Sequence, residues 1–180
     1  MNLSVSNLQD VALPDQVEML LDAVDVPAAA LILEITEDVL MADAPRSQQV
    51  MAGLRRLGVR LSIDDYGTGY SSLSYLRALP VDELKLDRSF VSDLTSDERA
   101  AAIVRSTLQL SLDLGMSMVV EGVEDAATLT ALRAWGCDFA QGYHIARPMP
   151  AERVLTWLAA QPAYRPRGGI PTQRGVHQPS

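Results

Sequence analysis

Oxygen-bearing and cationic side chains recur at the ends of short apolar runs along this chain. Carboxylates and carboxamides bind hard cations, so this set points to Mg²⁺ or Mn²⁺ rather than zinc. Only two histidines are present, which excludes a histidine-rich metal site. Adjacent Asp64 and Asp65 can hold two ions about 3.5–4 Å apart, an arrangement that enzymes use to split phosphate esters. The positions concerned are Asn2, Glu34, Asp64, Asp65, Lys85, Glu121 and Gln141.

Lys85 is the only lysine among 15 basic residues, the others being arginines. A compact ammonium can orient a water molecule on a metal ion or neutralise charge on phosphoryl oxygens. A general bias toward arginine explains the arginines but not why this one position is a lysine. Composition alone leaves open that Lys85 is a chance remainder.

Each of these motifs also has a purely structural interpretation. Asp64-Asp65 before Gly67-Thr68-Gly69 is, taken alone, typical of a turn and helix cap. Glu34 with Glu37, and Glu121 with Glu124, can be acids in the first turn of a helix. Gln141-Gly142 can be a kink at a strand end. Because the polar groups follow several separate apolar runs, we nevertheless favour a metal-dependent site.

Short apolar runs alternate with longer amphipathic ones, which predicts alternating strands and helices. Asp125 and Ser71 are expected N-caps, and Gly58 and Gly115 are expected to end helices. The expected strands are 28–34, 59–63, 82–86, 116–120 and 139–143. The expected helices are 15–24, 47–57, 71–79, 96–114, 125–135 and 151–160.

This order implies a parallel sheet with helices outside it, and the carboxyl ends of its strands meet at one edge. The steps between successive polar strand ends, from Asn2 to Gln141, average about 28 residues. An eight-unit barrel at that spacing needs roughly 220 residues. We therefore expect an α/β fold, a partial TIM-type (β/α) barrel with about six of eight βα units, the first two being absent.

Charge and composition narrow the class of protein. The chain has 180 residues and a net charge of −8, which suits one domain. Residues 161–180 contain Pro, Gly and Arg but no acid, which predicts an exposed, flexible tail. The remaining residues, 1–160, are expected to form the barrel part and contain 12 basic and 23 acidic side chains. Such acidity argues against a nucleic acid polymer as a partner. The single Cys137 fits the cytoplasm, and no apolar run predicts a membrane segment.

Five ordered motifs within residues 1–160 resemble the EAL domain of bacterial cyclic di-GMP phosphodiesterases. They are LEITE (33–37), IDDYGTGYSSL (63–73), LPVDELKLDRSF (79–90), VVEGVE (119–124) and QGYHIARPMP (141–150), and Met1–Ser4 resembles the family's N-L-S strand. The resemblance implies a TIM-type barrel with one antiparallel strand. It also implies hydrolysis of cyclic di-GMP to linear pGpG with Mg²⁺ or Mn²⁺, and we expect the site to bind two ions.

The resemblance also implies roles for individual residues. Lys85 matches the catalytic lysine, and Glu121 matches a carboxylate that binds the metal or activates its water. Metal ligands are implied at Asn2, Glu34, Asp64, which bridges, and Asp65. Glu37 matches the residue that anchors the loop 66–72, which includes Tyr66, Gly67, Thr68 and Gly69 and which couples a homodimer interface to the site. Glu124 and Gln141 match supporting residues, and Tyr66 replaces the family's usual Phe.

One departure from the family pattern is severe. The E-A-L motif, with its metal-binding Glu and a nearby substrate-binding Arg, precedes the N-L-S strand in the family, and the chain contains no such tripeptide. We therefore expect little or no catalysis by the chain as given, and we interpret Met1 as an internal start within a longer reading frame. Two alternatives stay open: a degenerate module that binds cyclic di-GMP or a protein partner, and an enolase-type barrel, which the Asp64-Asp65 pair and the lack of a second lysine disfavour.

Overall fold

The computed structural model describes residues 1–37, 39, 44–69 and 73–161, and it gives no side-chain description for 44, 74 and 75. The chain divides into two compact units, Met1–Arg147 and Pro148–Ser180. The first holds the sheet and the predicted site. The second contains helix α8 (Ala151–Ala160), as predicted. The predicted tail beyond residue 161 lies outside the described residues, and the predicted domain boundary at residue 160 stays a prediction.

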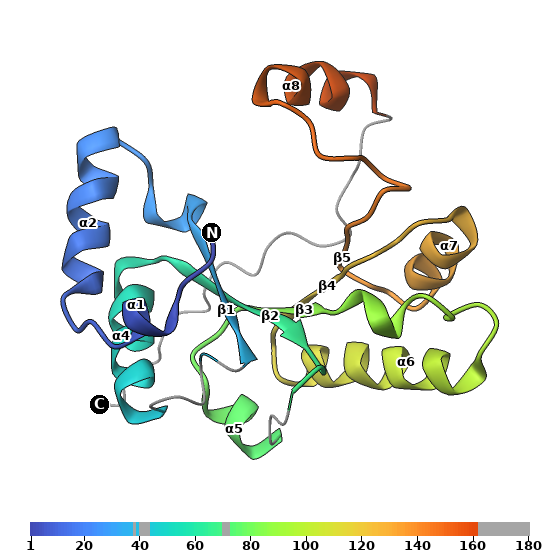
Figure 1. The fold of residues 1–180 in the computed structure, drawn as a ribbon, viewed down its shortest axis with the longest axis horizontal. Coiled ribbons are helices and arrows are strands. Elements are labelled where there is room, and N and C mark those ends of the chain that lie inside the picture. The colour runs from blue at the N-terminus through green and yellow to red at the C-terminus, as the bar shows by residue number, and fades with distance from the viewer. Residues whose placement is uncertain (38, 40–43, 70–72, 162–180) are drawn as a thin grey trace, which may run out of the picture. The chain divides into compact units, whose positions relative to one another are not determined.

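The described residues of the first unit form a five-stranded parallel sheet in sequence order (Figure 1). Every pair of neighbouring strands is parallel, so each connection must cross back over the sheet. At its outer edge Asn2 forms an isolated parallel bridge with Glu34. The strands are β1 (Ile32–Thr36), β2 (Arg60–Tyr66), β3 (Glu83–Leu86), β4 (Ser117–Val120) and β5 (Phe139–Ala140).

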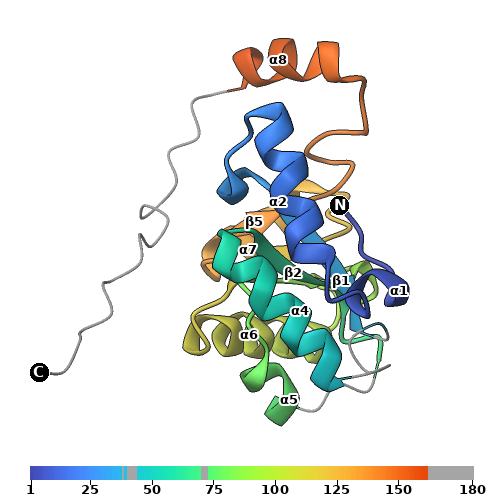
Figure 2. The same ribbon diagram turned by 90° about the vertical axis from the view of Figure 1, so that its left-hand side faces the viewer.

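Helices supply these crossovers and cover the sheet. Helix α4 contacts β2, α6 contacts β4, and α2 lies against α4 (Figures 1 and 2). The helices of the first unit are α1 (Val5–Leu8), α2 (Leu13–Val24), α4 (Ala44–Leu57), α5 (Leu73–Ala78), α6 (Glu98–Asp113) and α7 (Ala126–Ala134), with short 3₁₀ turns η1 (Ala28–Ala30) and η2 (Arg88–Phe90). Among the described residues, no helix is both long and apolar enough to cross a bilayer.

The core lies between the sheet and these helices. All four residues of β3 are buried, as a central strand of a covered parallel sheet must be. Burial of their apolar side chains is the main force holding the layers together. The fully buried side chains include Leu33, Ile35, Leu61, Ile63, Leu84, Leu86, Met51, Leu54 and Met118.

Several local signals act as predicted. Asp125 caps α7, because its carboxylate accepts the backbone N–H of Thr128 at 2.8 Å. Gly58 follows the end of α4 with a φ of 92°, a conformation that favours glycine. The other predicted N-cap, Ser71, lies outside the described residues.

Three predicted strands had wrong boundaries. Residues 28–30 form the 3₁₀ turn η1, because three alanines after Pro27 favour a helical turn over a strand, and β1 does not end at Glu34 but continues to Thr36. Strand β2 does not end at Ile63 but continues to Tyr66. Strand β5 has two residues rather than five, because after Ala140 the chain turns over the backbone of Val123. The Gln141 carbonyl accepts the Val123 N–H, and a Cβ at Gly142 would collide with the Val123 backbone.

Candidate metal centre

Lys85 lies in the middle of three acidic residues that come from three other segments of the chain. It lies on the buried strand β3 and is itself only 8% exposed. Its Nζ lies 2.7 Å from Asp64 Oδ1 on β2, 2.7 Å from Glu121 Oε1 just after β4, and 3.1 Å from Glu34 Oε1 on β1. Because β3 lies between β2 and β4, a lysine at its carboxyl end can reach acids from both neighbours.

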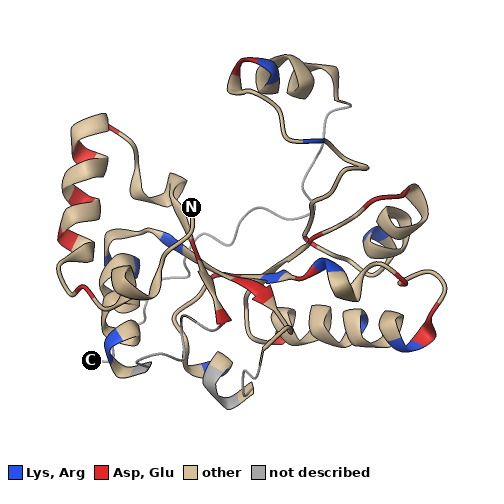
Figure 3. Cartoon of the chain, in the orientation of Figure 1, with Lys and Arg blue, Asp and Glu red and all other residues tan. Residues whose placement is uncertain are grey.

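The electrostatics of Lys85 favour its charged form. Burial alone would lower the pKa of its ammonium, but hydrogen bonds to Asp64, Glu121 and Glu34 outweigh burial and raise the pKa above its ordinary value. The ammonium therefore keeps its charge at neutral pH. Figure 3 shows acidic and basic positions meeting in the central strands of the sheet.

Asp64 and Asp65 approach each other through an irregularity in β2. In a regular strand, consecutive side chains point to opposite faces of the sheet. Here the β2–β3 register shifts between Ile63 and Tyr66, and Asp65 has a left-handed φ of 54°, which aspartate tolerates better than most residues. As a result, carboxylate oxygens of Asp64, Asp65 and Glu121 all lie within 4.8 Å of one another.

This cluster, defined here as Asp64, Asp65 and Glu121, has the donors that a hard cation needs. Burial, followed by the charges of Asp64 and Asp87, raises the pKa of Asp65, and only Lys85 opposes that rise. Such crowding of negative charge is what a divalent ion relieves. The oxygen-only donor set fits Mg²⁺ or Mn²⁺.

Asp87 is a neighbour of the site that the sequence reasoning missed. It lies two residues after Lys85, and its carboxylate accepts the Ser89 N–H at 3.0 Å. The hydrogen bond to Ser89 lowers the pKa of Asp87, so it stays ionised and adds negative charge near Asp65. The signal available in the sequence was the position of Asp87 directly after the strand that carries Lys85, since residues at the carboxyl ends of parallel strands lie at the same edge of the sheet.

Glu37 holds the segment that follows Asp65. Its side chain is 4% exposed, and its Oε2 accepts the N–H of Gly67 at 3.4 Å and of Gly69 at 3.3 Å. Thr68 turns back and donates its hydroxyl to the Asp65 carbonyl at 2.9 Å. The predicted contact between Glu37 and this loop is therefore present up to residue 69, while residues 70–72 lie outside the described part. The coupling of the loop to a dimer interface stays a prediction.

The remaining predicted residues are not members of the cluster. Asn2 is exposed and joins Glu34 through the backbone bridge. Glu34 reaches the cluster through Lys85 rather than as one of its members. Glu124 and Gln141 are exposed, and the Gln141 backbone N–H donates to the Val120 carbonyl at 2.8 Å. Roles for these residues stay predictions.

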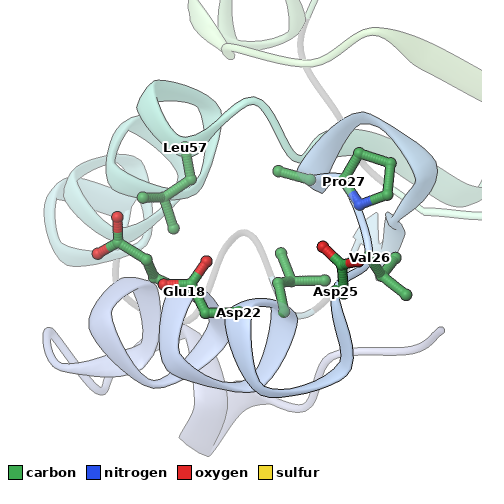
Figure 4. Close-up of a pocket in the computed structure, with 8 residues that line it drawn as sticks. Glu18, Asp22, Asp25, Val26, Pro27 and Leu57 are labelled. Atoms are coloured by element: carbon green, nitrogen blue, oxygen red, sulfur yellow. The ribbon is translucent and has the colours of Figure 1, made fainter.

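A separate cavity of about 380 Å³ lies between α2, the end of α4 and the segment that precedes β1 (Figure 4). It is lined by Glu18, Asp22 and Asp25 with apolar residues including Pro27 and Leu57. Pro27 precedes β1 and Leu57 precedes β2, so the cavity lies at the amino-terminal side of the sheet. Active sites of parallel α/β barrels form at the carboxyl ends of the strands, and we assign this cavity no part in the metal centre.

Comparison with known proteins identifies the family of this fold and site. A family model described as "EAL domain" matches residues 1–148. This chain belongs to the EAL domain family. The predicted fold class, part of a TIM-type α/β barrel, is thereby confirmed, and the enolase-type alternative is rejected.

Relatives of this EAL chain are longer than the chain itself. It is 40% identical over 157 residues to the cyclic di-GMP phosphodiesterase PA2567 of Pseudomonas aeruginosa, covering 87% of this chain and 27% of that protein. The solved structure titled "PaMucR Phosphodiesterase, c-di-GMP complex" matches with a TM-score of 0.79 and 43% identity, over 85% of this chain and 62% of the other. The EAL domain of Mycobacterium smegmatis DcpA matches with a TM-score of 0.82 and 38% identity, over 88% of this chain and 71% of the other.

Proposed function

We propose that this EAL chain forms the larger part of a phosphodiesterase domain that hydrolyses cyclic di-GMP to linear pGpG with Mg²⁺ or Mn²⁺. The observation that carries the proposal is the convergence of Asp64, Asp65 and Glu121 around Lys85. The similarity to the cyclic di-GMP phosphodiesterase PA2567 supports it, as does the similarity to the MucR phosphodiesterase, whose solved structure contains cyclic di-GMP. Two ions are proposed because adjacent aspartates can share one ligand between two metals.

In this proposal the acidic residues hold the ions and Lys85 acts on the phosphate. Bound divalent ions supply positive charge and a more acidic water. Asp64 and Asp65 are already turned to one side by the β2 irregularity, so they need little rearrangement to bind. The Lys85 ammonium, which lies among these carboxylates, stabilises negative charge that develops on the phosphoryl oxygens. The residues proposed as ligands are Asn2, Glu34, Asp64, Asp65 and Glu121.

The bond changes of the proposed reaction balance without a further reactant. The oxygen of one water forms a bond to phosphorus, and the bond between phosphorus and the ribose 3′ oxygen breaks. One proton of that water ends on the 3′ oxygen, which leaves a 3′ hydroxyl and a 5′ phosphate. Glu121 is the carboxylate proposed to accept the proton as the water attacks, because it belongs to the cluster and also contacts Lys85.

Activity of the 180 residues alone is expected to be low. In the family resemblance, the E-A-L segment supplies a metal ligand and a substrate-binding arginine, and the sequence here contains no E-A-L tripeptide. Loss of one preorganised group in a catalytic site typically costs on the order of 100-fold in rate. We therefore expect at least that deficit relative to a complete domain.

A chimera tests the proposed function. The part of the MucR EAL domain that precedes its residue equivalent to Asn2 is fused in front of Asn2. Hydrolysis of cyclic di-GMP with Mn²⁺ is then measured for the chimera and for the 180-residue chain. The chimera is expected to produce pGpG, and its Asp64→Asn variant is expected to lose that activity. A folded chimera that binds cyclic di-GMP and Mn²⁺ without turnover would contradict the proposal.

That contrary outcome would favour the second candidate, a module that binds cyclic di-GMP or a protein partner. One observation supports it: Leu73, at the start of α5 just beyond the loop that Glu37 holds, is 60% exposed. The exposure of Leu73 likewise supports our proposal of a homodimer formed through this loop. Calorimetry with cyclic di-GMP measures binding of the nucleotide. Sedimentation of wild type and Leu73→Ser measures self-association through the loop. We further propose that the protein acts in the cytoplasm and without a nucleic acid polymer as a partner.

A further inference from the structure

Lys85 and the acidic cluster draw on the same carboxylates. Lys85 has ion pairs with Glu34, Asp64 and Glu121, whereas the cluster consists of Asp64, Asp65 and Glu121. The two shared members, Asp64 and Glu121, are also the closest partners of Lys85, each at 2.7 Å. A cation held by the cluster and the ammonium of Lys85 therefore depend on the same negative charge.

The environment makes that overlap costly. The Lys85 side chain is 10% exposed, and those of Asp64 and Glu121 are 15% and 21% exposed, so water screens these charges poorly. Two positive charges a few ångströms apart repel strongly under such conditions. A carboxylate oxygen that binds a divalent ion gives up electron density to it and becomes a weaker acceptor for the 2.7 Å contact with Lys85.

We propose that Lys85 is an internal counter-ion of this centre and competes with a divalent cation for Asp64 and Glu121. The inference rests on the proposed function only in treating the cluster as a metal site. Metal binding then weakens at least one of the two shortest contacts of Lys85 Nζ. Glu34, 3.1 Å from Nζ, lies outside the cluster but is also proposed as a ligand, so the competition extends to this third partner of Lys85.

A lysine suits this role better than an arginine. Its ammonium is a compact charge on a flexible four-carbon stem, so it can move between carboxylates without losing a planar two-point contact. The strand position fixes the stem in the core, while the three acids surround its end. The counter-ion also neutralises charge that would otherwise destabilise the folded chain.

Mn²⁺ binding to the 180-residue chain tests the competition directly. Calorimetry is performed on wild type, Lys85→Met, which keeps the length but removes the charge, and Lys85→Arg, which keeps the charge. We expect Lys85→Met to lower the Mn²⁺ Kd on the order of tenfold, as for ordinary coupling between two ligands, and Lys85→Arg, which keeps the competing charge, to give no such decrease. An equal or higher Kd for Lys85→Met overturns the inference.

Asp65→Asn is the matched control within the cluster. Asp65 belongs to the cluster but is not one of the three ion-pair partners of Lys85. Its variant should weaken Mn²⁺ binding in the wild-type and Lys85→Met backgrounds alike. If wild type binds Mn²⁺ through Asp65 but Lys85→Met binds no tighter, the counter-ion inference fails while the proposed metal site stands. If neither protein binds Mn²⁺, both fail.

Thermal melting covers the case in which Lys85→Met folds poorly. Without its counter-ion this variant should melt below wild type, and Mn²⁺ should raise its melting temperature by more than it raises that of wild type, because ligand binding stabilises the folded state. Recovery of the folded far-UV signal on adding Mn²⁺ supports the inference. A variant that stays unfolded at saturating Mn²⁺ overturns it.

Discussion

Lys85 on β3 and Glu121 after β4 are joined by a 2.7 Å ion pair, and a backbone hydrogen bond from Glu121 N–H to the Leu86 carbonyl at 3.1 Å fixes their register. This backbone contact places Glu121 beside the end of β3, so its carboxylate reaches Lys85. A substitution that changes only the charge of Glu121 should therefore leave the strand pairing intact.

In the chimera with a complete EAL domain, we expect Glu121→Gln to lower the rate of cyclic di-GMP hydrolysis by about 100-fold or more, because a positioned base or metal ligand is lost. The melting temperature should change little. Glu98→Gln, an exposed acid in the first turn of α6, serves as the control and should keep full activity. A Glu121→Gln chimera that retains more than a tenth of the wild-type rate would argue against this role.

Asp65→Asn should stabilise the 180-residue chain at neutral pH when no divalent metal is added. Burial, then repulsion from Asp64 and Asp87, raises the pKa of Asp65. A carboxyl group whose folded-state pKa lies above its unfolded value destabilises the fold while it is charged, and the penalty disappears as the pH falls through that pKa. Melting curves from pH 7 down to about pH 3 should show the advantage of Asn shrinking.

The alternative cause of such a gain is the backbone. Asn also tolerates the left-handed φ of 54° at this position, but that contribution does not depend on pH. A stability difference that stays constant across the titration would assign the effect to the backbone and contradict the charge explanation.

Gly67→Ala should destabilise the loop after Asp65 through two causes. The φ of +98° at Gly67 disfavours any residue with a Cβ, and the added Cβ would lie 2.8 Å from the Phe90 ring. Left-handed backbone costs a non-glycine residue about 1–2 kcal/mol, and the contact with Phe90 adds to that cost. Chemical denaturation measures the loss.

Gly115→Ala is the matched control for that substitution. Gly115 has a φ of +72°, but a Cβ there meets nothing within 4 Å, so only the backbone cost applies. The excess loss in Gly67→Ala should fall in the background of Phe90→Leu, which shortens the ring side chain. Equal losses at the two glycines would show that Phe90 exerts no steric limit on the loop.

Cys137 should react slowly with thiol reagents. Burial raises the pKa of its thiol from 9.0 to about 11, and its Sγ donates to the Phe139 carbonyl at 3.0 Å. A rise of that size lowers the thiolate fraction at pH 8 by about 100-fold. Ellman's reagent applied to the native and urea-unfolded chain measures the ratio, and equal rates would contradict the burial of this thiol.

Much of this architecture followed from the sequence alone. The alternation of apolar runs with amphipathic stretches predicted five parallel strands and their helices, because burial on both faces of a covered sheet requires near-continuous apolar strands. The bounds of α8 were predicted as observed. The grouping of Asp64, Lys85 and Glu121 also followed, since the carboxyl ends of parallel strands must meet at one edge.

Other features depended on the tertiary structure. The side on which Asp65 lies could not be read from its position after Asp64, because strict alternation would have placed the two carboxylates on opposite faces. The register shift in β2 and the left-handed backbone decide it, and both arise from pairing with β3 and from the loop that Glu37 holds. Likewise, sequence identified a lone lysine among acids, but only strand order determined that its ammonium is shared by Glu34, Asp64 and Glu121. Residue types set which chemistry is available, whereas distances between segments far apart in the chain are set by packing.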